Sequence, residues 1–262
     1  MSKKDILFNP YRPGDEDHLY FNDSKILKYF LGSLRLVERY FRYDVVGIDN
    51  IPSRSPALLV LNHGFIPLDL ILLGRRIYRQ TGRRIRVLVH RRSWRIPVLR
   101  EVALNIGMVD AKPENAVRLL KKGELVCVFP GGEREGMKPS GMKYQLMWED
   151  RIGFVQTAVL AKAPIVPCMS VGIDDVYHIF EKSTRHLAGK MFHRYFPFPV
   201  FLGLGGLPCP RKIVHYLGKP IKYRLKPSEA DNMKQIKKIH ARVWSESEIL
   251  LKKGLRERRW FE

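Results

Sequence analysis

Residues 58–69 read Leu-Leu-Val-Leu-Asn-His-Gly-Phe-Ile-Pro-Leu-Asp. The first four, all apolar, predict a buried strand, and the apolar run that reopens at Leu70 predicts a helix of about Leu70 to Thr81. A buried strand that leads through a polar turn into a helix is typical of α/β proteins, which place their chemistry at the carboxyl ends of strands. His63 and Asp69 are therefore the first candidates for a functional site.

Two interpretations of this turn are open. In the first, His63 is a general base and Asp69 holds the imidazole in the tautomer that accepts a proton from a hydroxyl group. No serine or cysteine nucleophile motif lies beside the pair, so the hydroxyl would belong to a substrate. In the second, His63 is an ordinary turn residue and Asp69 caps the following helix. Since six residues of regular helix rotate by roughly 600°, the two side chains can meet only across a non-helical turn.

The chain is strongly basic. Its 262 residues include 47 Lys and Arg against 26 Asp and Glu, a formal net charge of +21. This charge favours a polyanionic partner, which is nucleic acid, an anionic membrane surface or a phosphorylated substrate. Because no base-reading motif accompanies the charge, we expect an anionic membrane surface as partner and no nucleic acid.

Two segments concentrate the positive charge. No acidic residue lies between Asp69 and Glu101, where the ten arginines are Arg75, Arg76, Arg79, Arg83, Arg84, Arg86, Arg91, Arg92, Arg95 and Arg100. The second segment, residues 252–261, carries Lys252, Lys253, Arg256, Arg258, Arg259, Trp260 and Phe261. A charge run usually forms a solvated face. Here the interleaved aromatic and apolar residues favour membrane attachment, to which each basic residue contributes about 1 kcal/mol.

Cysteines and apolar runs limit the class of protein further. Cys127, Cys168 and Cys209 lack metal-ligand spacing, so we expect reduced thiols and no metal site. The start of the chain has no apolar stretch of signal-peptide length, and no run of 18 apolar residues predicts a transmembrane helix. We therefore expect a peripheral protein on the cytoplasmic face of a membrane.

Strand-like and helix-like segments alternate after residue 44. Short strands are expected at 45–48, 57–61, 85–89, 105–109, 125–129, 165–171 and 212–216, and helices at 70–81, 113–122 and 151–162. This alternation predicts an α/β fold, a single layered domain with a largely parallel central sheet flanked by helices. The domain is expected over 44–230, preceded by an arm and a basic amphipathic helix over 1–43. A basic helix over 231–262 is expected to pack on the domain.

Two other segments each have two interpretations. The amphipathic helix of about Lys25 to Arg42 either packs on the domain or lies on a bilayer. The segment 191–210 is apolar, aromatic and interrupted by Pro and Gly. It is either a buried loop or a loop that dips into lipid or lines an acyl channel.

A second constellation follows the strand expected at 125–129. It reads Pro130-Gly131-Gly132-Glu133-Arg134-Glu135-Gly136. Glycines after a buried strand let a ligand approach the backbone closely, and Arg134 can bind an oxyanion. Since Pro-Gly-Gly is also an ordinary turn, this segment gains weight only together with the others.

Taken in order, four blocks resemble those of the glycerolipid (lysophospholipid-type) acyltransferase family. They are Asn62-His63 to Asp69, Gly107 to Lys112, Phe129 to Glu135 and Pro164 to Pro167, and the resemblance covers residues 44–222. It implies transfer of an acyl group from an acyl thioester, either acyl-CoA or acyl carrier protein, to a lipid hydroxyl. No metal or redox cofactor is implied, and the thioester is a co-substrate.

The same resemblance implies roles for individual residues. His63 would be the general base, and Asp69 would be its orienting partner. The acceptor head group would bind to Gly131, Gly132, Glu133, Arg134 and Glu135, and Pro167 would help to shape the pocket. A hydroxyl that attacks a thioester needs a base and oxyanion stabilisation, but no covalent enzyme intermediate.

Two departures from the common pattern resemble the neutral-lipid branch of this family, which is similar to diacylglycerol acyltransferases, and a third weakens the case for a phosphate-bearing acceptor. Five residues instead of four separate His63 from Asp69, and Gly131 stands where Glu commonly follows Phe-Pro. The usual arginine of the second block is missing, and Asp110 and Lys112 lie in its neighbourhood. We therefore expect a neutral acceptor, which is diacylglycerol, monoacylglycerol or a long-chain alcohol.

Two alternatives stay open. Arg134 is compatible with a lysophosphatidate-type acceptor, because a guanidinium binds phosphate well. The longer gap between His63 and Asp69 and the missing arginine are compatible with a lipid- or membrane-binding protein that keeps the fold without turnover.

Overall fold

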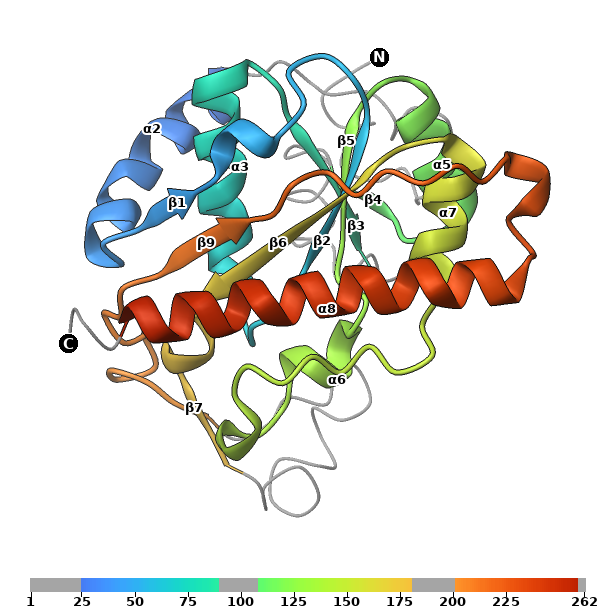
Figure 1. Ribbon diagram of the computed structural model, residues 1–262. Coiled ribbons are helices and arrows are strands. Elements are labelled where there is room, and N and C mark those ends of the chain that lie inside the picture. The colour runs from blue at the N-terminus through green and yellow to red at the C-terminus, as the bar shows by residue number, and fades with distance from the viewer. Residues whose placement is uncertain (1–24, 90–107, 181–200, 259–262) are drawn as a thin grey trace, which may run out of the picture.

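A seven-stranded sheet forms the centre of the computed structural model, which describes residues 25–89, 108–180 and 201–258 (Figure 1). The strand order is β1-β9-β6-β2-β5-β3-β4. The strands are β1 (Asp44–Val46), β2 (Ala57–Leu61), β3 (Ile85–Val89), β4 (Val109–Asp110), β5 (Leu125–Val128), β6 (Ile165–Val171) and β9 (Val214–Leu217). Strands β6, β2, β5, β3 and β4 are parallel, whereas β9 is antiparallel to β6 and β1 is parallel to β9. The expected single layered α/β domain with a largely parallel sheet is confirmed.

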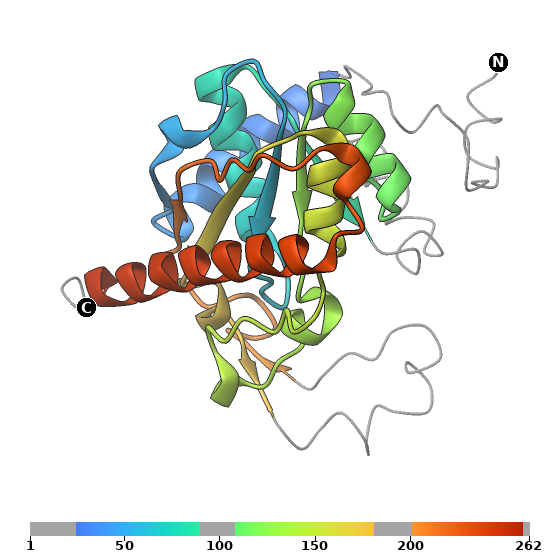
Figure 2. The same ribbon diagram turned by 45° about the vertical axis from the view of Figure 1, so that its right-hand side comes forward.

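Helices cover both faces of this sheet. One face carries α3 (Leu68–Thr81), against which α2 (Lys25–Tyr40) packs, and the other carries α5 (Pro113–Lys121), α7 (Gly153–Ala161) and α8 (Met233–Arg258). The long helix α8 runs across the front of the sheet in Figures 1 and 2. At the carboxyl end of the central strands lie the short helix α6 (Gly132–Gly136) and the pair β7 (His178–Ile179) and β8 (Phe201–Leu202). Short 3-10 turns occupy Ile48–Asn50, Ser140–Met142, Ile173–Asp175 and Pro227–Glu229.

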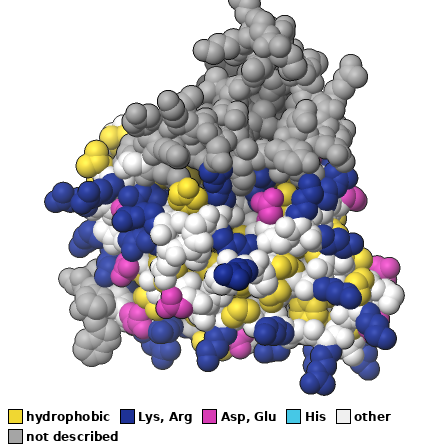
Figure 3. Space-filling view, turned by 90° about the horizontal axis from the view of Figure 1, so that it is seen from above, with side chains coloured by type: hydrophobic (Ala, Val, Ile, Leu, Met, Phe, Trp, Pro, Cys, Tyr) yellow, Lys and Arg dark blue, Asp and Glu magenta, His cyan; other side chains and the backbone are white. Residues whose placement is uncertain are grey.

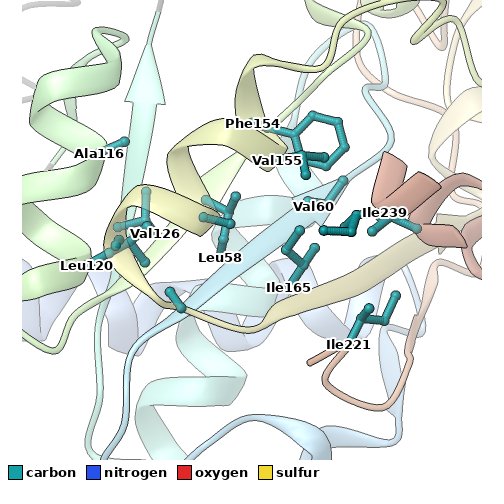
Figure 4. Close-up of a cluster of buried hydrophobic side chains, with 14 of the residues drawn as sticks. Leu58, Val60, Ala116, Leu120, Val126, Phe154, Val155, Ile165, Ile221 and Ile239 are labelled. Atoms are coloured by element: carbon teal, nitrogen blue, oxygen red, sulfur yellow. The ribbon is translucent and has the colours of Figure 1, made fainter. Parts of the chain in front are cut away.

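All five residues of β2 are fully buried, and their side chains point alternately to the two faces of the sheet. Leu58 and Val60 face α5, α7 and α8, in the cluster that Figure 4 shows. Leu59 and Leu61 point to the opposite face, toward α3. Because both faces are covered, β2 reads as a continuous apolar run, which is typical of a parallel strand between two helix layers.

Some element boundaries differ from the prediction. Helix α3 begins at Leu68, so Asp69 lies in its first turn. The interpretation of Asp69 as the helix cap is wrong, because Pro67 occupies that position and the Asp69 side chain is buried in the protein. The strand expected at 105–109 is described only as Val109–Asp110, since residues 90–107 lie outside the described part of the chain. Residues 191–200, the first half of the segment 191–210, also lie outside it.

Helix α2 packs on the domain, which is the first of the two interpretations given for this segment. Leu34 and the following Phe41 are buried in a cluster with Leu72 of α3. Glu38 forms ion pairs with Arg75 and Arg76 of α3. Within residues 25–89, 108–180 and 201–258, no helix has both the length and the apolar character needed to cross a bilayer.

Several arginines of the basic segment form ion pairs and hydrogen bonds within the domain. Arg75 is 6% exposed and pairs with Glu38, and Arg86 is fully buried with its Nε atom 3.9 Å from Glu124. Arg83 donates hydrogen bonds to the carbonyls of Pro52, Ser55 and Gly123 and so ties three loops together. Arg75 and Arg86 are therefore not available to a membrane surface, because their side chains are buried, and a guanidinium with five donors can satisfy several buried acceptors. Lys and Arg side chains nevertheless cover much of the described surface seen in Figure 3.

Two helical glycines should respond in opposite directions to alanine. A Cβ atom at Gly254 of α8 would lie 2.5 Å from the Tyr216 ring and 2.7 Å from Val171, whereas one at Gly74 of α3 would meet nothing within 4 Å. Gly254→Ala should lower the free energy of unfolding by about 1–3 kcal/mol through overpacking. Gly74→Ala should raise it by about 0.5–1 kcal/mol through helix propensity. Urea unfolding measures both, and equal shifts would contradict the close packing of α8 on β6 and β9.

Candidate active site

The turn at residues 62–67 begins where β2 ends, and a buried side chain fixes its position. Asn62 is 2% exposed. Its amide donates to the carbonyl of Ser170 at 3.0 Å, and its carbonyl oxygen accepts the Ser170 N–H at 2.7 Å. Since Ser170 belongs to β6, these two bonds extend the pairing of β2 and β6 beyond the last strand residue. His63 is therefore held at the carboxyl edge of the sheet, as predicted.

The His63 imidazole is held in a defined tautomer. Its Nδ1 atom lies 2.6 Å from the carbonyl oxygen of Gly64. A carbonyl only accepts hydrogen bonds, so Nδ1 carries the proton and Nε2 presents a lone pair. No residue in the described part of the chain donates a hydrogen bond to Nε2. Burial lowers the pKa of His63, with a further lowering by Lys138, so the ring is neutral at pH 7.

The glycine-rich segment of α6 lies directly against this histidine. Glu135 is fully buried, and its carboxylate accepts the His63 backbone N–H at 2.7 Å and the Met147 N–H at 3.0 Å. A Cβ atom at Gly136 would lie 2.7 Å from His63 Nδ1, so only glycine fits there. The ring of His63 also packs on Phe129 with centroids 4.6 Å apart. The first and third sequence blocks thus meet, because β2 and β5 are parallel neighbours.

A buried ion pair supports the same turn from the other side. Lys138 donates to the carbonyl of His63 at 3.3 Å and pairs with Asp174 at 2.9 Å. Asp174 also accepts the Tyr144 N–H at 2.7 Å. The sequence analysis missed Lys138 and Asp174. The pair Asp174-Asp175 just after the strand at 165–171 is the signal that could have indicated the second of them.

Asp69 forms no hydrogen bond with the imidazole of His63 and lies next to a second histidine. The Asp69 side chain is fully buried, and its Oδ2 atom is 3.6 Å from Nε2 of His215 in β9. His215 Nδ1 lies 2.9 Å from the hydroxyl of Tyr43. Among the described residues neither carboxylate oxygen of Asp69 has a hydrogen bond of good geometry. The structure therefore brings Asp69 together with His215 and Tyr43, and it does not bring the carboxylate into hydrogen-bond contact with His63.

Burial controls the protonation of this Asp69–His215 pair. It raises the pKa of Asp69 to about 7, an effect that the nearby Ser170 hydroxyl partly opposes. It lowers the pKa of His215 to about 3. At pH 5 the folded pair therefore holds one proton on Asp69, whereas the unfolded chain holds one proton on His215. Tyr43 and His215 escaped the sequence analysis, because nothing in the local pattern of either segment indicates that they meet.

The other residues expected at the site lie around α6 or inside the sheet. Gly131 and Gly132 form its first turn, where Gly132 has φ +54° and Arg151 donates to the carbonyls of Pro130 and Gly131. Glu133 lies in the same helix, near enough to raise the pKa of His63 slightly. The Arg134 side chain is 56% exposed and pairs with Glu149 at 2.8 Å. Pro167 is buried within β6, in register with Val60.

A narrow pocket adjoins the His63 turn. Phe65, Gly136, Lys138, Asp174 and Tyr177 line it, and it has room for about one water molecule. In the described part of the chain, His, Cys, Asp and Glu side chains form no cluster that could hold a metal ion.

Comparison with known proteins shows the family. The family model described as "Diacylglycerol acyltransferase" matches residues 63–252, which begin at His63 and extend into α8. The chain belongs to the diacylglycerol acyltransferase family. The matched region contains His63, α6, Lys138, Asp69 and His215, whereas Tyr43 lies before it.

Three individual proteins illustrate what this chain is similar to. An uncharacterized protein of Mycobacterium tuberculosis is 34% identical over 203 residues, which are 75% of this chain and 55% of that protein. The human "DGAT1/2-independent enzyme synthesizing storage lipids" is 32% identical over 185 residues, 69% of this chain and 54% of its own length. The chain thus spans about half the length of these curated relatives. The crystal structure of the 1-acyl-sn-glycerophosphate acyltransferase PlsC from Thermotoga maritima matches with 19% identity and a TM-score of 0.49, over 86% of this chain and 83% of that chain.

Replacing either member of the Asp69–His215 pair should change how the stability of this diacylglycerol acyltransferase family member depends on pH. The two replacements should act in opposite directions. In Asp69→Asn only His215 titrates, and its pKa is about 3 when folded and 6.5 when unfolded. The unfolded state then binds the extra proton, so stability should rise with pH between these values by about 1.4 kcal/mol per pH unit. In His215→Gln only Asp69 titrates, at about 7 when folded and 3.8 when unfolded, so stability should fall as pH rises over that range.

Chemical denaturation at a series of pH values measures both slopes relative to the wild type. In the wild type the two contributions cancel, because both states of the pair hold one proton between about pH 4 and 6.5. Slopes of the same sign in the two variants would contradict the assigned protonation states.

Proposed function

We propose that this chain is a membrane-associated acyltransferase that moves a fatty acyl group from an acyl thioester to a lipid hydroxyl, with His63 as general base. One observation carries the proposal. The Gly64 carbonyl accepts a hydrogen bond from Nδ1 of His63 at 2.6 Å, which leaves the Nε2 lone pair of a neutral imidazole for the substrate. Such a group accepts a proton from an alcohol as the alcohol oxygen attacks a carbonyl carbon.

The reaction proceeds by direct transfer between the two substrates. The acceptor hydroxyl gives its proton to Nε2 while its oxygen forms a bond to the thioester carbonyl carbon. The bond from carbon to sulfur then breaks, and the imidazolium returns the proton to the leaving thiolate. The hydrogen bond from Nδ1 to Gly64 keeps the ring oriented throughout. Coenzyme A and acyl carrier protein are both suitable thiol carriers, and no resident cofactor takes part.

Asp69 supports His63 indirectly in this proposal. The carboxyl group is buried against His215 of β9, with 3.6 Å between Oδ2 and Nε2, and it belongs to the first turn of α3, immediately after the turn that carries His63. This contact supports the start of α3 and so the path of residues 63–67. Glu135 has a comparable bracing role, since both of its oxygens accept backbone N–H groups. Gly131, Gly132, Glu133 and Arg134 are left as the candidates for contact with the acceptor head group.

The acceptor proposed is a neutral glycerolipid or a long-chain alcohol. Gly131 at the start of the α6 turn and the name of the human relative, which synthesizes storage lipids, support this choice. We further propose peripheral attachment to the cytoplasmic face of an anionic membrane, in keeping with the net charge of +21.

Acyl transfer from labelled long-chain acyl-CoA to diacylglycerol, monoacylglycerol, a long-chain alcohol and lysophosphatidate tests the function. His63→Ala should lower the rate of product formation by a factor of about 10²–10⁴, as expected for the loss of a general base. His240→Gln on α8 is the matched control and should keep its activity. Preference for lysophosphatidate would overturn the neutral acceptor, and no product from either acyl-CoA or acyl carrier protein would favour a lipid-binding protein without turnover.

The rate should depend on pH as the lowered pKa of His63 requires. Only the neutral imidazole acts as base, so kcat/KM should rise with pH and level off at or below neutrality. The midpoint of this rise should lie below 6.5, the usual pKa of histidine. A pH profile of kcat/KM measures the midpoint, and a value above 6.5 would contradict the lowered pKa of the partly buried His63.

A further inference from the structure

A tight hairpin of leucine and glycine projects from the end of the domain that carries His63. Leu204 and Leu207 exchange backbone hydrogen bonds of 2.7 and 3.1 Å. Between them Gly205 and Gly206 have φ values of +61° and +90°. Two successive positive φ values define the two-residue turn that fits the twist of a β-hairpin. The segment 201–207, here called the leucine hairpin, is therefore a defined turn with its own backbone hydrogen bonds.

The outer surface of the leucine hairpin is apolar. Leu202, Leu204 and Leu207 are 61%, 62% and 66% exposed. Phe201 and the neighbouring Phe180 are also exposed, at 36% and 42%. A group of large apolar side chains in water is unfavourable, and soluble proteins use such patches as binding surfaces.

The inner side of the leucine hairpin is anchored to the active-site turn. The Phe201 ring lies 4.8 Å from that of Phe65 and 5.1 Å from that of Tyr177. A Cβ atom at Gly203 would lie 2.8 Å from the Tyr177 ring, so the backbone itself packs on this aromatic group. Phe65 is two residues from His63. Whatever binds the leucine hairpin is therefore held close to the catalytic base.

The sequence around the hairpin matches a lipid surface better than a protein surface. No charged residue lies between Arg194 and Arg211, and exposed Arg211 follows the hairpin closely. A protein partner is recognised through polar groups and hydrogen bonds at the rim of the interface, but the exposed tip offers only leucine and glycine. Apolar side chains beside a cationic residue match the acyl region and the anionic head groups of a bilayer.

We propose that the leucine hairpin inserts into a lipid bilayer and sets the His63 turn against the membrane surface. The choice of lipid as occupant rests on the proposed function, because a substrate with long acyl chains is supplied from a bilayer. Attachment then has two parts: the leucines enter the acyl region, and basic side chains such as Arg211 stay among the head groups.

Binding of the 262-residue chain to vesicles tests this inference independently of turnover. Leu204→Ser/Leu207→Ser should weaken binding to phosphatidylcholine vesicles containing phosphatidylserine by at least about tenfold, given the cost of losing buried leucine side chains. Ile249→Ser on α8, another exposed aliphatic position at 53%, is the matched control and should bind like wild type. Part of the binding should survive high salt in the wild type but not in the double variant, since salt screens only the charges.

Further measurements distinguish the other occupants of the hairpin. Leu207→Trp should shift its fluorescence to shorter wavelength on vesicle addition and be quenched by lipids brominated on the acyl chain. Undiminished binding of the double variant, or an equal loss in Leu36→Ser on α2, would overturn the proposal. The proposal would also be overturned if the wild type formed a dimer and the double variant were monomeric, because the leucines would then bind a second copy of this chain. If no acyl transfer is found but insertion is, the proposed function fails and this inference stands.

Discussion

The buried carboxylate of Glu135 joins the parts of the site that the rest of the structure positions. It lies 72 residues from His63 along the chain and accepts the His63 backbone N–H and the Met147 backbone N–H. Burial raises its pKa, while Lys138 and these two backbone donors oppose that rise. A buried carboxylate is tolerable only with such partners. The turn after β2, the helix after β5 and the loop at residue 147 are thus tied to one side chain.

Polar groups inside this domain are concentrated where elements must be held in place against one another. Asn62 joins β2 to β6, and the group of Asp69, His215 and Tyr43 joins α3 to β9 and to the residues before β1. Arg75 and Arg83 join helix and loops in the same way. These groups add directional contacts to a core whose apolar clusters are not directional. The high arginine content therefore serves the fold as well as any anionic partner.

The candidate functional residues lie at the carboxyl end of the central strands. His63, α6 and the leucine hairpin are all found there, and Phe65 links the first to the last. This arrangement fits the proposed reaction, in which a lipid hydroxyl from a bilayer reaches His63. Helix α8 covers one face of the sheet, and Gly254 allows it to lie close to Tyr216 of β9.

The sequence by itself determined the layered α/β fold, the buried strand β2 and the position of His63 at its end, because continuous and periodic apolar residues specify burial locally. It also indicated the four blocks of the family. Only the tertiary structure decided that Glu135 points inward, that Asp69 meets His215 instead of the His63 ring, and that Arg75 and Arg86 are buried. The physical reason is that a polar side chain is buried where its partners are, and those partners lie on strands and helices that the order of the sheet brings together. The spacing of residues along the sequence does not specify the order of the strands in the sheet.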